Sequence, residues 1–307
     1  FSLSGCIFFW LYAEAVAAKQ VGPKAFFVLR FSRLYPLHFV TLIIVAVLQL
    51  VYLGLNGIYY AHDNNDLYHF VLNIFFASKW GLEDGPSFNA PIWSVSVEVL
   101  LYFIFFLLCW LRLNRVSVVI GMCLAGLALG EVYGFIARGV LSFFVGGLVF
   151  YFYRWSLASR ERMMRVLKLA TIATVVLWLA YIIGTNAVIW DVVSVPALFG
   201  KIATKLVMLL LIPVSILFLA LVETWRPLEW KSLQFIGDLT YSIYLIHFPL
   251  QIVFALAFFP AFGVDVAQTY WFFGLYFVVL VILGRLSFVY FEIPAQRFLR
   301  RLLLRRQ

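Results

Sequence analysis

The chain has 307 residues, of which 65% are hydrophobic and only 12% charged. About 45–50% apolar residues is usual for a soluble domain, so this composition excludes a water-soluble globular protein. The net charge of +9 does not indicate a nucleic-acid partner, because the basic residues sit in short segments between apolar runs.

Apolar runs of about 20 residues, the length that crosses a bilayer, recur from end to end of the chain. The sequence predicts an all-α polytopic integral membrane helix bundle with nine visible spans, at 1–18, 34–53, 92–111, 116–133, 138–153, 169–184, 200–222, 235–259 and 269–291. The apolar segment 68–78 is too short to cross and is expected to be interfacial or re-entrant. No polar stretch is long enough for a soluble domain, so we expect one transmembrane domain over 1–307.

Lys and Arg gather in alternate segments between these spans, and cytoplasmic segments of membrane proteins are rich in both residues. With the C-terminus in the cytoplasm, the inner segments 19–33, 112–115, 154–168, 223–234 and 292–307 hold 18 of the 23 basic residues. We therefore expect a multi-pass inner-membrane protein with a cytoplasmic C-terminus. Residue 1 then lies outside, and we expect one further span upstream of it, ten in all.

Arg30 and Arg33 stand at the cytoplasmic mouth of the span at 34–53. Residues three apart share one face of a helix, so the two guanidinium groups are placed to grip a phosphate together. The alternative is a pair of positive-inside anchors that reach toward lipid headgroups. His38 stands five residues after Arg33 and is expected to be a hydrogen-bonded interface histidine, with membership of the arginine site as the alternative.

Glu98 falls about two helical turns, or roughly 9 Å, into the span at 92–111, with Ser94 one turn before it. A carboxylate at that depth must pair or take up a proton, so Glu98 is a candidate for either a catalytic or a structural role. Arg285, midway along the last span, is expected to be structural, with Glu98, Asp238 or Glu292 as its partner.

Thr240, Tyr244 and His247 follow one another at helical spacing in the span at 235–259 and predict a polar stripe on one face. His247 is either a satisfied core residue or part of a site, and Pro249 is expected to bend the helix beside it. The outer-loop residues His62, Asp63, Asp66 and His69 are expected to form a solvated loop rather than a metal site. No cluster in the sequence has metal-ligand spacing.

Three of these segments, in this order, resemble the acyltransferase-3 family: RFSRLYP at 30–36, WSVSVE at 93–98 and YSIYLIHFP at 241–249. Further support comes from FSLSG at 1–5, FFVGG at 143–147 and YFEIP at 290–294, so the likeness covers essentially the whole chain. The resemblance implies ten spans and transfer of an acyl group, often acetyl from cytoplasmic acetyl-CoA, to hydroxyls of surface glycans, lipid-linked sugars or small molecules.

The resemblance also implies residue roles. Arg30 and Arg33 match the family's arginine motif and would bind acyl-CoA. In our own interpretation of the site, Glu98 and His247 support catalysis and Trp93 and Tyr244 contact substrate. The family's catalytic histidine precedes the stretch Leu3-Ser4-Gly5, where this chain begins. We therefore expect the base to lie on the upstream span, and residues 1–307 alone to be inactive.

The sequence thus favours an O-acyltransferase that takes acyl-CoA as donor and a glycan or lipid-linked sugar as acceptor among membrane lipids, without a metal or a nucleic-acid partner. The first alternative is a transporter or exporter, which also needs polar residues inside the membrane, but no matched pair of broken helices is visible. The second is a non-enzymatic membrane scaffold, in which the buried charges would merely pair.

Overall fold

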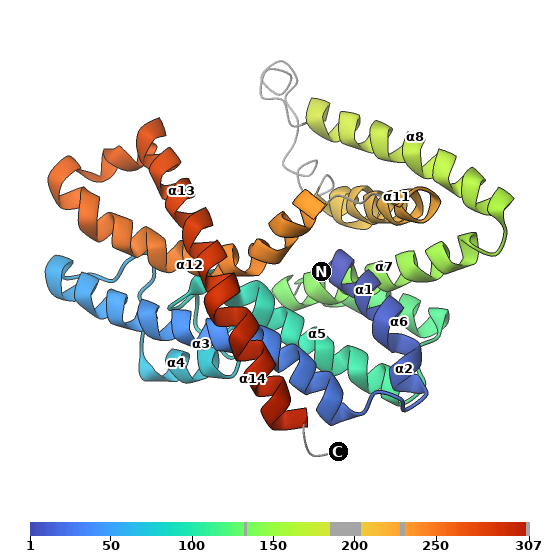
Figure 1. Cartoon of the computed structure of the whole chain (residues 1–307), viewed down its shortest axis with the longest axis horizontal. Coiled ribbons are helices and arrows are strands. Elements are labelled where there is room, and N and C mark those ends of the chain that lie inside the picture. The colour runs from blue at the N-terminus through green and yellow to red at the C-terminus, as the bar shows by residue number, and fades with distance from the viewer. Residues whose placement is uncertain (132–133, 185–203, 228–230, 305–307) are drawn as a thin grey trace. The chain divides into compact units, whose positions relative to one another are not determined.

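The computed structural model describes residues 1–131, 134–184, 204–227 and 231–304, and these are helical apart from turns and loops (Figure 1). The chain divides into two compact units. The first comprises Phe1–Gln20 and Leu101–Glu229, and the second comprises Val21–Leu100 and Trp230–Gln307. Helix α5 (Trp93–Trp110) runs from the second into the first. The expectation of a single domain over 1–307 stays a prediction.

Seven helical runs in the described residues are long and apolar enough to cross a membrane: Pro23–Asn56, Ala90–Trp110, Gly134–Ser156, Arg160–Gly184, Thr204–Trp225, Phe235–Phe262 and Tyr270–Leu304. They correspond to seven of the nine predicted spans, although residues 200–203 lie outside the described part. The other two predicted spans are shorter apolar helices, Ser2–Ala17 and Val116–Ala128. The prediction of an all-α polytopic membrane protein is confirmed.

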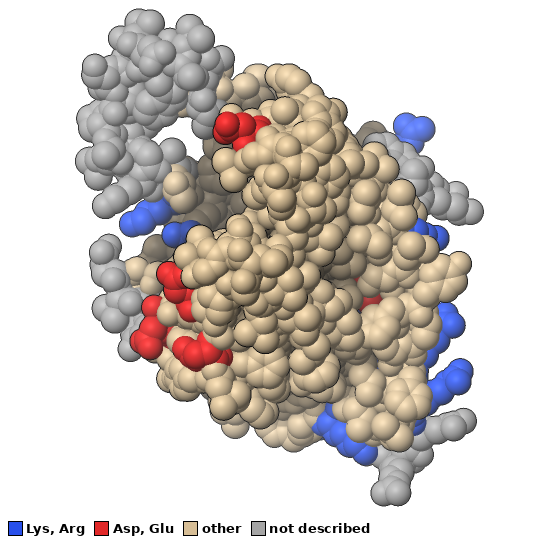
Figure 2. All heavy atoms as spheres, turned by 90° about the vertical axis from the view of Figure 1, so that its left-hand side faces the viewer, with Lys and Arg blue, Asp and Glu red and all other residues tan. Residues whose placement is uncertain are grey.

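Large apolar side chains cover the outside of these helices, as expected where lipid is the solvent. Leu50, Trp10 and Leu169 are 63%, 65% and 67% exposed. The surface in Figure 2 is mostly free of charge, and the charged side chains form small separate groups. Burial of apolar side chains therefore does not distinguish inside from outside here, and close packing and polar contacts hold the helices together.

The first unit contains α1 (Ser2–Phe8), a π-helical turn (Phe9–Ala13), α2 (Glu14–Ala17), α6 (Val116–Ala128), α7 (Gly134–Ser156), α8 (Arg160–Gly184) and α11 (Ile212–Trp225). Helix α1 packs on α7 at two glycines. A Cβ atom on Gly146 would lie 2.0 Å from the Ser2 carbonyl oxygen, and one on Gly5 would lie 1.9 Å from that of Phe143. Only glycine allows this approach, which explains why FSLSG and FFVGG occur together.

Polar contacts in the first unit join segments that the Lys and Arg pattern assigns to the same side of the membrane. Lys19 donates to the Trp110 carbonyl oxygen and lies over the Trp110 ring, with the nitrogen 3.3 Å from the ring centroid. Arg154 pairs with Glu14, and Tyr151 donates to the Asn114 carbonyl oxygen. The segments following Glu14, Trp110 and Arg154 therefore lie on the same side, as predicted.

The second unit contains α3 (Pro23–Asn56), α4 (Leu67–Ile74), α12 (Lys231–Phe262), α13 (Tyr270–Ser287), a π-helical turn (Phe288–Glu292) and α14 (Ile293–Leu304). The run from α13 through α14 is continuous. At 1.5 Å per residue, α3 and this run each extend about 50 Å, whereas the apolar core of a bilayer is about 30 Å thick. Their polar ends therefore reach beyond the apolar layer. Helix α4, the segment predicted at 68–78, has 8 residues and is too short to cross.

Helices α3 and α12 meet in a buried cluster that contains Leu42, Val45, Phe248 and Ile252. Gln49, only 1% exposed, accepts a hydrogen bond from the Tyr60 amide (2.8 Å) and donates one to the Tyr60 carbonyl oxygen (3.0 Å). This pair of bonds fixes the loop that leaves α3. The opposite end of α3 carries Arg30 and Arg33, so the unit has two chemically distinct ends.

Candidate functional site

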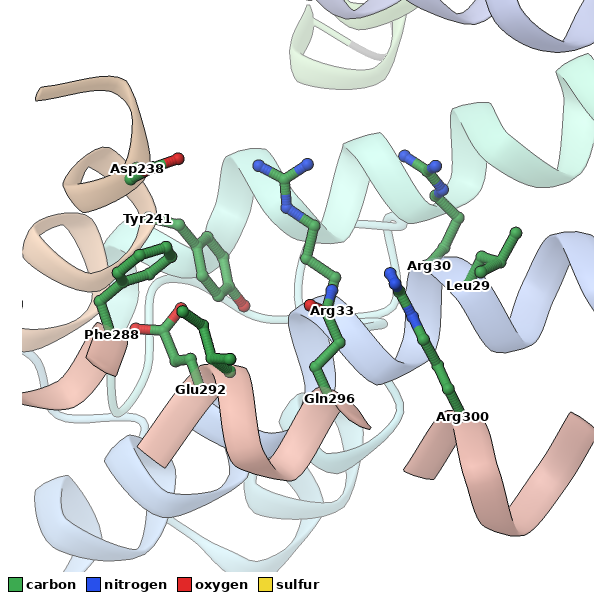
Figure 3. A pocket seen from close by; sticks show the side chains of 10 residues that line it. Leu29, Arg30, Arg33, Asp238, Tyr241, Phe288, Glu292, Gln296 and Arg300 are labelled. Atoms are coloured by element: carbon green, nitrogen blue, oxygen red, sulfur yellow. The ribbon is translucent and has the colours of Figure 1, made fainter. Parts of the chain in front are cut away.

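A polar pocket of about 260 Å³ lies in the second unit, where α3, the first turns of α12 and the run from the π-helical turn into α14 come together (Figure 3). Its lining residues are Leu29, Arg30, Arg33, Asp238, Tyr241, Phe288, Glu292, Ile293, Gln296 and Arg300. The three contributing segments are those that the charge pattern assigns to one membrane side. Their meeting in one pocket supports that shared sidedness independently of the Lys and Arg count.

The arginine pair is placed by local helix geometry, and both side chains line the pocket from α3. Arg300 enters from α14, and its Nε donates to the Ser32 hydroxyl oxygen at 3.2 Å. Arg300 was not predicted as a site residue from the sequence. The one signal for it was its place in an amphipathic helix after the last span.

The end of the pocket nearest α12 is acidic and aromatic. Glu292 accepts hydrogen bonds from the hydroxyls of Ser242 and, at 3.3 Å, Ser287. Asp238 and Tyr241 lie beside it, while Arg30 and Arg300 lie toward the other end (Figure 3). The π-helical turn at Phe288–Glu292 supplies Glu292, and such turns are frequent at functional sites. The pocket is therefore polarised, with positive charge at one end and carboxylates at the other.

A second polar cluster lies further along α12. Tyr244 shares a hydrogen bond with Ser94 (2.7 Å between hydroxyl oxygens) and donates to the Pro91 carbonyl oxygen. His247 Nδ1 donates to the Tyr244 carbonyl oxygen at 2.6 Å, because a carbonyl oxygen only accepts. Trp93 opens α5 in the same region.

Glu98 is half-buried on α5, one helical turn after Ser94. The structure brings Ser94, Tyr244 and His247 together, but Glu98, His247, Trp93 and Tyr244 do not line the arginine pocket. Their catalytic and substrate-binding roles stay predictions.

Two expectations need correction, namely the partner of Arg285 and the polar stripe on α12. Arg285 forms no ion pair with Glu98, Asp238 or Glu292, all of which are in the described part of the chain. Its guanidinium carbon instead lies 5.0 Å from the centre of the exposed Phe235 ring. A cation on an aromatic face is stabilised without a carboxylate, so the prediction of an acidic partner for Arg285 was wrong.

The polar stripe on α12 is interrupted. Thr240 is exposed and donates to the Gly237 carbonyl oxygen at 2.7 Å, within its own helix, so it does not join Tyr244 and His247. His38 is fully buried, and its Nε2 donates to the Asn73 carbonyl oxygen at 2.7 Å while its ring stacks on Phe76. His38 is thus a hydrogen-bonded interface histidine, and it does not line the arginine pocket.

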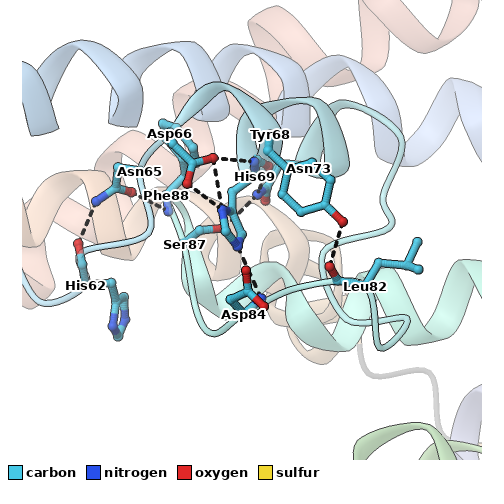
Figure 4. Close-up of polar contacts among 10 residues, drawn as sticks. All are labelled: His62, Asn65, Asp66, Tyr68, His69, Asn73, Leu82, Asp84, Ser87 and Phe88. Atoms are coloured by element: carbon cyan, nitrogen blue, oxygen red, sulfur yellow. Dashed lines mark hydrogen bonds and ion pairs between the residues drawn. The ribbon is translucent and has the colours of Figure 1, made fainter.

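The loops on either side of α4 are held by a hydrogen-bond network of their own (Figure 4). Asp66 caps α4 by accepting from the His69 amide at 2.9 Å, and its carboxylate also accepts from His69 Nδ1. These bonds from the backbone and then the side chain of His69 lower the pKa of Asp66 below its ordinary value. His69 Nε2 accepts from the Asp84 amide at 3.3 Å. The loop is therefore built by hydrogen bonds. No group of three metal-ligand side chains occurs among the residues that the structure describes.

Comparison with known proteins indicates the class of reaction, which the geometry of the site alone does not identify. The model of a family described as an acyltransferase domain matches residues 1–288, which includes most of both units. No curated protein and no solved structure matches the chain. The matched stretch contains the arginine pair, Glu98 and His247, in the order that the sequence motifs have. The chain belongs to the acyltransferase-3 family and is a multi-pass membrane acyltransferase.

Proposed function

We propose that this protein transfers an acyl group, with acetyl as the representative case, from acyl-CoA in the cytoplasm to a hydroxyl group of a carbohydrate or lipid-linked glycan. The observation that carries the proposal is the pocket in which Arg30 and Arg33 converge. Guanidinium groups bind phosphate oxygens bidentately, and the donor carries its negative charge on phosphates.

The proposed reaction follows from the chemistry of the two substrates. The acceptor hydroxyl oxygen attacks the thioester carbonyl carbon, the carbon–oxygen bond forms, and the carbon–sulfur bond breaks. The hydroxyl proton passes to a base and then to the departing thiolate, which leaves as CoA. The arginines hold the donor, while Trp93, Glu98, Tyr244 and His247 position the acceptor or orient the base.

The proposal includes an orientation in the membrane. Acyl-CoA is made in the cytoplasm, and the arginine pocket lies among segments that the Lys and Arg bias assigns to that side. We therefore place the pocket and the C-terminus at the cytoplasmic face of the inner membrane. The loop from Gly57 to Asp66 lies at the other end of α3 and faces outward in this orientation.

The test is a comparison of lysine variants in the full-length protein. Lysine keeps the charge of Arg30 and Arg33 but removes the planar fork that grips phosphate. The Arg30→Lys, Arg33→Lys double variant is expected to lose at least about tenfold in kcat/KM for transfer of labelled acetyl from acetyl-CoA, about 1.4 kcal/mol. The Arg160→Lys, Arg165→Lys double variant, in an exposed segment of α8, is the matched control. Full activity of the first variant would mean that the pair only anchors the membrane.

A further inference from the structure

A third arginine completes the phosphate-binding end of the pocket, and it comes from outside the stretch that matches the family. Arg300 lies on α14, twelve residues beyond position 288, and lines the same pocket as Arg30 and Arg33. Figure 3 shows its guanidinium group directed toward the same end of the pocket as that of Arg30. Guanidinium groups from two different helices therefore converge on one space.

Ser32 fixes the position of Arg300 relative to the arginine pair. This serine is only 1% exposed and lies between Arg30 and Arg33 on α3. Its hydroxyl donates to the Leu29 carbonyl oxygen at 3.3 Å, which leaves the oxygen lone pairs to accept from Arg300 Nε at 3.2 Å. Nε is the guanidinium nitrogen nearest the side-chain stem. A hydrogen bond from Nε therefore fixes the orientation of the whole guanidinium plane.

The charge in the pocket favours an anionic ligand. Three arginines line the pocket together with two acidic residues, Asp238 and Glu292. The carboxylates lie at the α12 end, so the end near Arg30 and Arg300 has a surplus of positive charge (Figure 3). Like charges brought together in a partly closed space repel one another, and a bound polyanion relieves that repulsion.

The three arginines come from two different helices, so they can contact more than one anionic group of the same ligand. Arg30 and Arg33 lie on one helix face and suit a single diphosphate group. Arg300 approaches from another helix and suits a second group. An acyl-CoA molecule carries a diphosphate and, separately, a phosphomonoester on the 3′ oxygen of its ribose.

We propose that Arg300, positioned by Ser32, binds the 3′-phosphomonoester of the donor and makes the enzyme select acyl-CoA over acyl-dephospho-CoA. This inference rests on the proposed function, since it concerns the same donor. It adds a specificity-determining residue to the site and assigns a function to α14. Ser32 is a positioning residue, and Arg300 is the residue that touches the ligand.

The test measures kcat and KM of the full-length protein for acetyl-CoA and for acetyl-dephospho-CoA. The unaltered protein is expected to prefer acetyl-CoA by about tenfold or more in kcat/KM. Arg300→Gln is expected to raise KM for acetyl-CoA about tenfold and to leave KM for acetyl-dephospho-CoA unchanged, so that the preference disappears. Ser32→Ala is expected to weaken the preference in the same direction. Arg297→Gln, an exposed arginine of α14 that does not line the pocket, is the matched control.

The outcomes separate this inference from the proposed function. Equal loss of activity toward both donors in Arg300→Gln, or no preference in the unaltered protein, would overturn the inference and leave the proposed function standing. Failure of the unaltered protein to use either donor would overturn both. If Arg300→Gln does not accumulate in the membrane, Ser32→Ala decides: an unchanged donor preference in that variant overturns the inference.

Discussion

Tyr241 on α12 donates its phenolic hydrogen to the Leu34 carbonyl oxygen on α3, with 2.5 Å between the two oxygens. Leu34 directly follows Arg33, so this bond ties the wall of the pocket to the helix that carries the arginine pair. The two residues are 207 positions apart in the chain. The bond therefore holds together two helices that no local interaction joins.

Replacing Tyr241 by Phe removes this bond and keeps the ring. A typical hydrogen bond contributes about 0.5–1.5 kcal/mol, so the variant is expected to raise KM for the acyl donor about two- to tenfold with little change in kcat. Steady-state kinetics of labelled acetyl transfer measures both constants. Tyr290→Phe makes the same chemical change on a side chain from a residue that is 75% exposed, and serves as the control. An unchanged KM in Tyr241→Phe would show that the bond does not position the arginines.

Glu98 and His247 are expected to act in the reaction rather than only in folding. Glu98→Gln removes a charge from α5, and His247→Ala removes a ring whose Nδ1 is already oriented by Tyr244. Each variant is expected to remain in the membrane and to lose about tenfold or more in acyl transfer, about 1.4 kcal/mol or above in barrier.

Membrane yield and initial rates, measured on the same preparations, distinguish the two roles. His62→Ala, which changes a histidine of the outer loop, is the control for loss of an imidazole. A variant that fails to insert would support the structural role for that residue, Glu98 or His247.

The glycine contact between α1 and α7 is expected to tolerate no side chain. Valine at Gly146 would place its Cβ 2.0 Å from the Ser2 carbonyl oxygen, so the helices must move apart. Overpacking of this kind costs about 1–3 kcal/mol, and Gly146→Val is expected to lower the Tm of the detergent-solubilised protein. Thermal unfolding followed by size-exclusion chromatography measures the change. Gly121→Ala on α6, where the new Cβ meets no other side chain or neighbouring helix within 4 Å, should keep the Tm or raise it slightly.

The orientation of the second unit can be tested with single cysteines. Asn64→Cys in the outer loop is expected to react with a membrane-impermeant maleimide in intact cells. Lys24→Cys, exposed near the start of α3, should react only after the membrane is permeabilised. The protein with its native cysteines alone gives the background, since Cys109 and Cys123 are buried. Labelling of both positions from the same side would contradict the orientation and the span assignment together.

Much of the fold could be predicted from the sequence, because lipid as a solvent imposes simple rules. Apolar runs of bilayer length must be helical, since every backbone polar group has to be satisfied within the segment. The Lys and Arg pattern also predicted which segments share a membrane side, and the pocket brings three of them together. The placement of Arg30 and Arg33 on one face needed only the helical repeat.

The partners of individual polar residues were decided by the tertiary structure. Arg285 lies on Phe235 rather than beside a carboxylate, and Arg300 reaches Ser32 across 268 positions of the chain. In a membrane, most helix surfaces are equally apolar, so hydrophobicity does not select which helices become neighbours. That choice depends on close contacts such as Gly5 against Phe143 and on bonds such as Tyr241 to Leu34, which form only after distant segments pack. The sequence by itself determined that this is a membrane-embedded helix bundle with a cationic end. Side-chain packing between distant helices decided which arginines share the pocket.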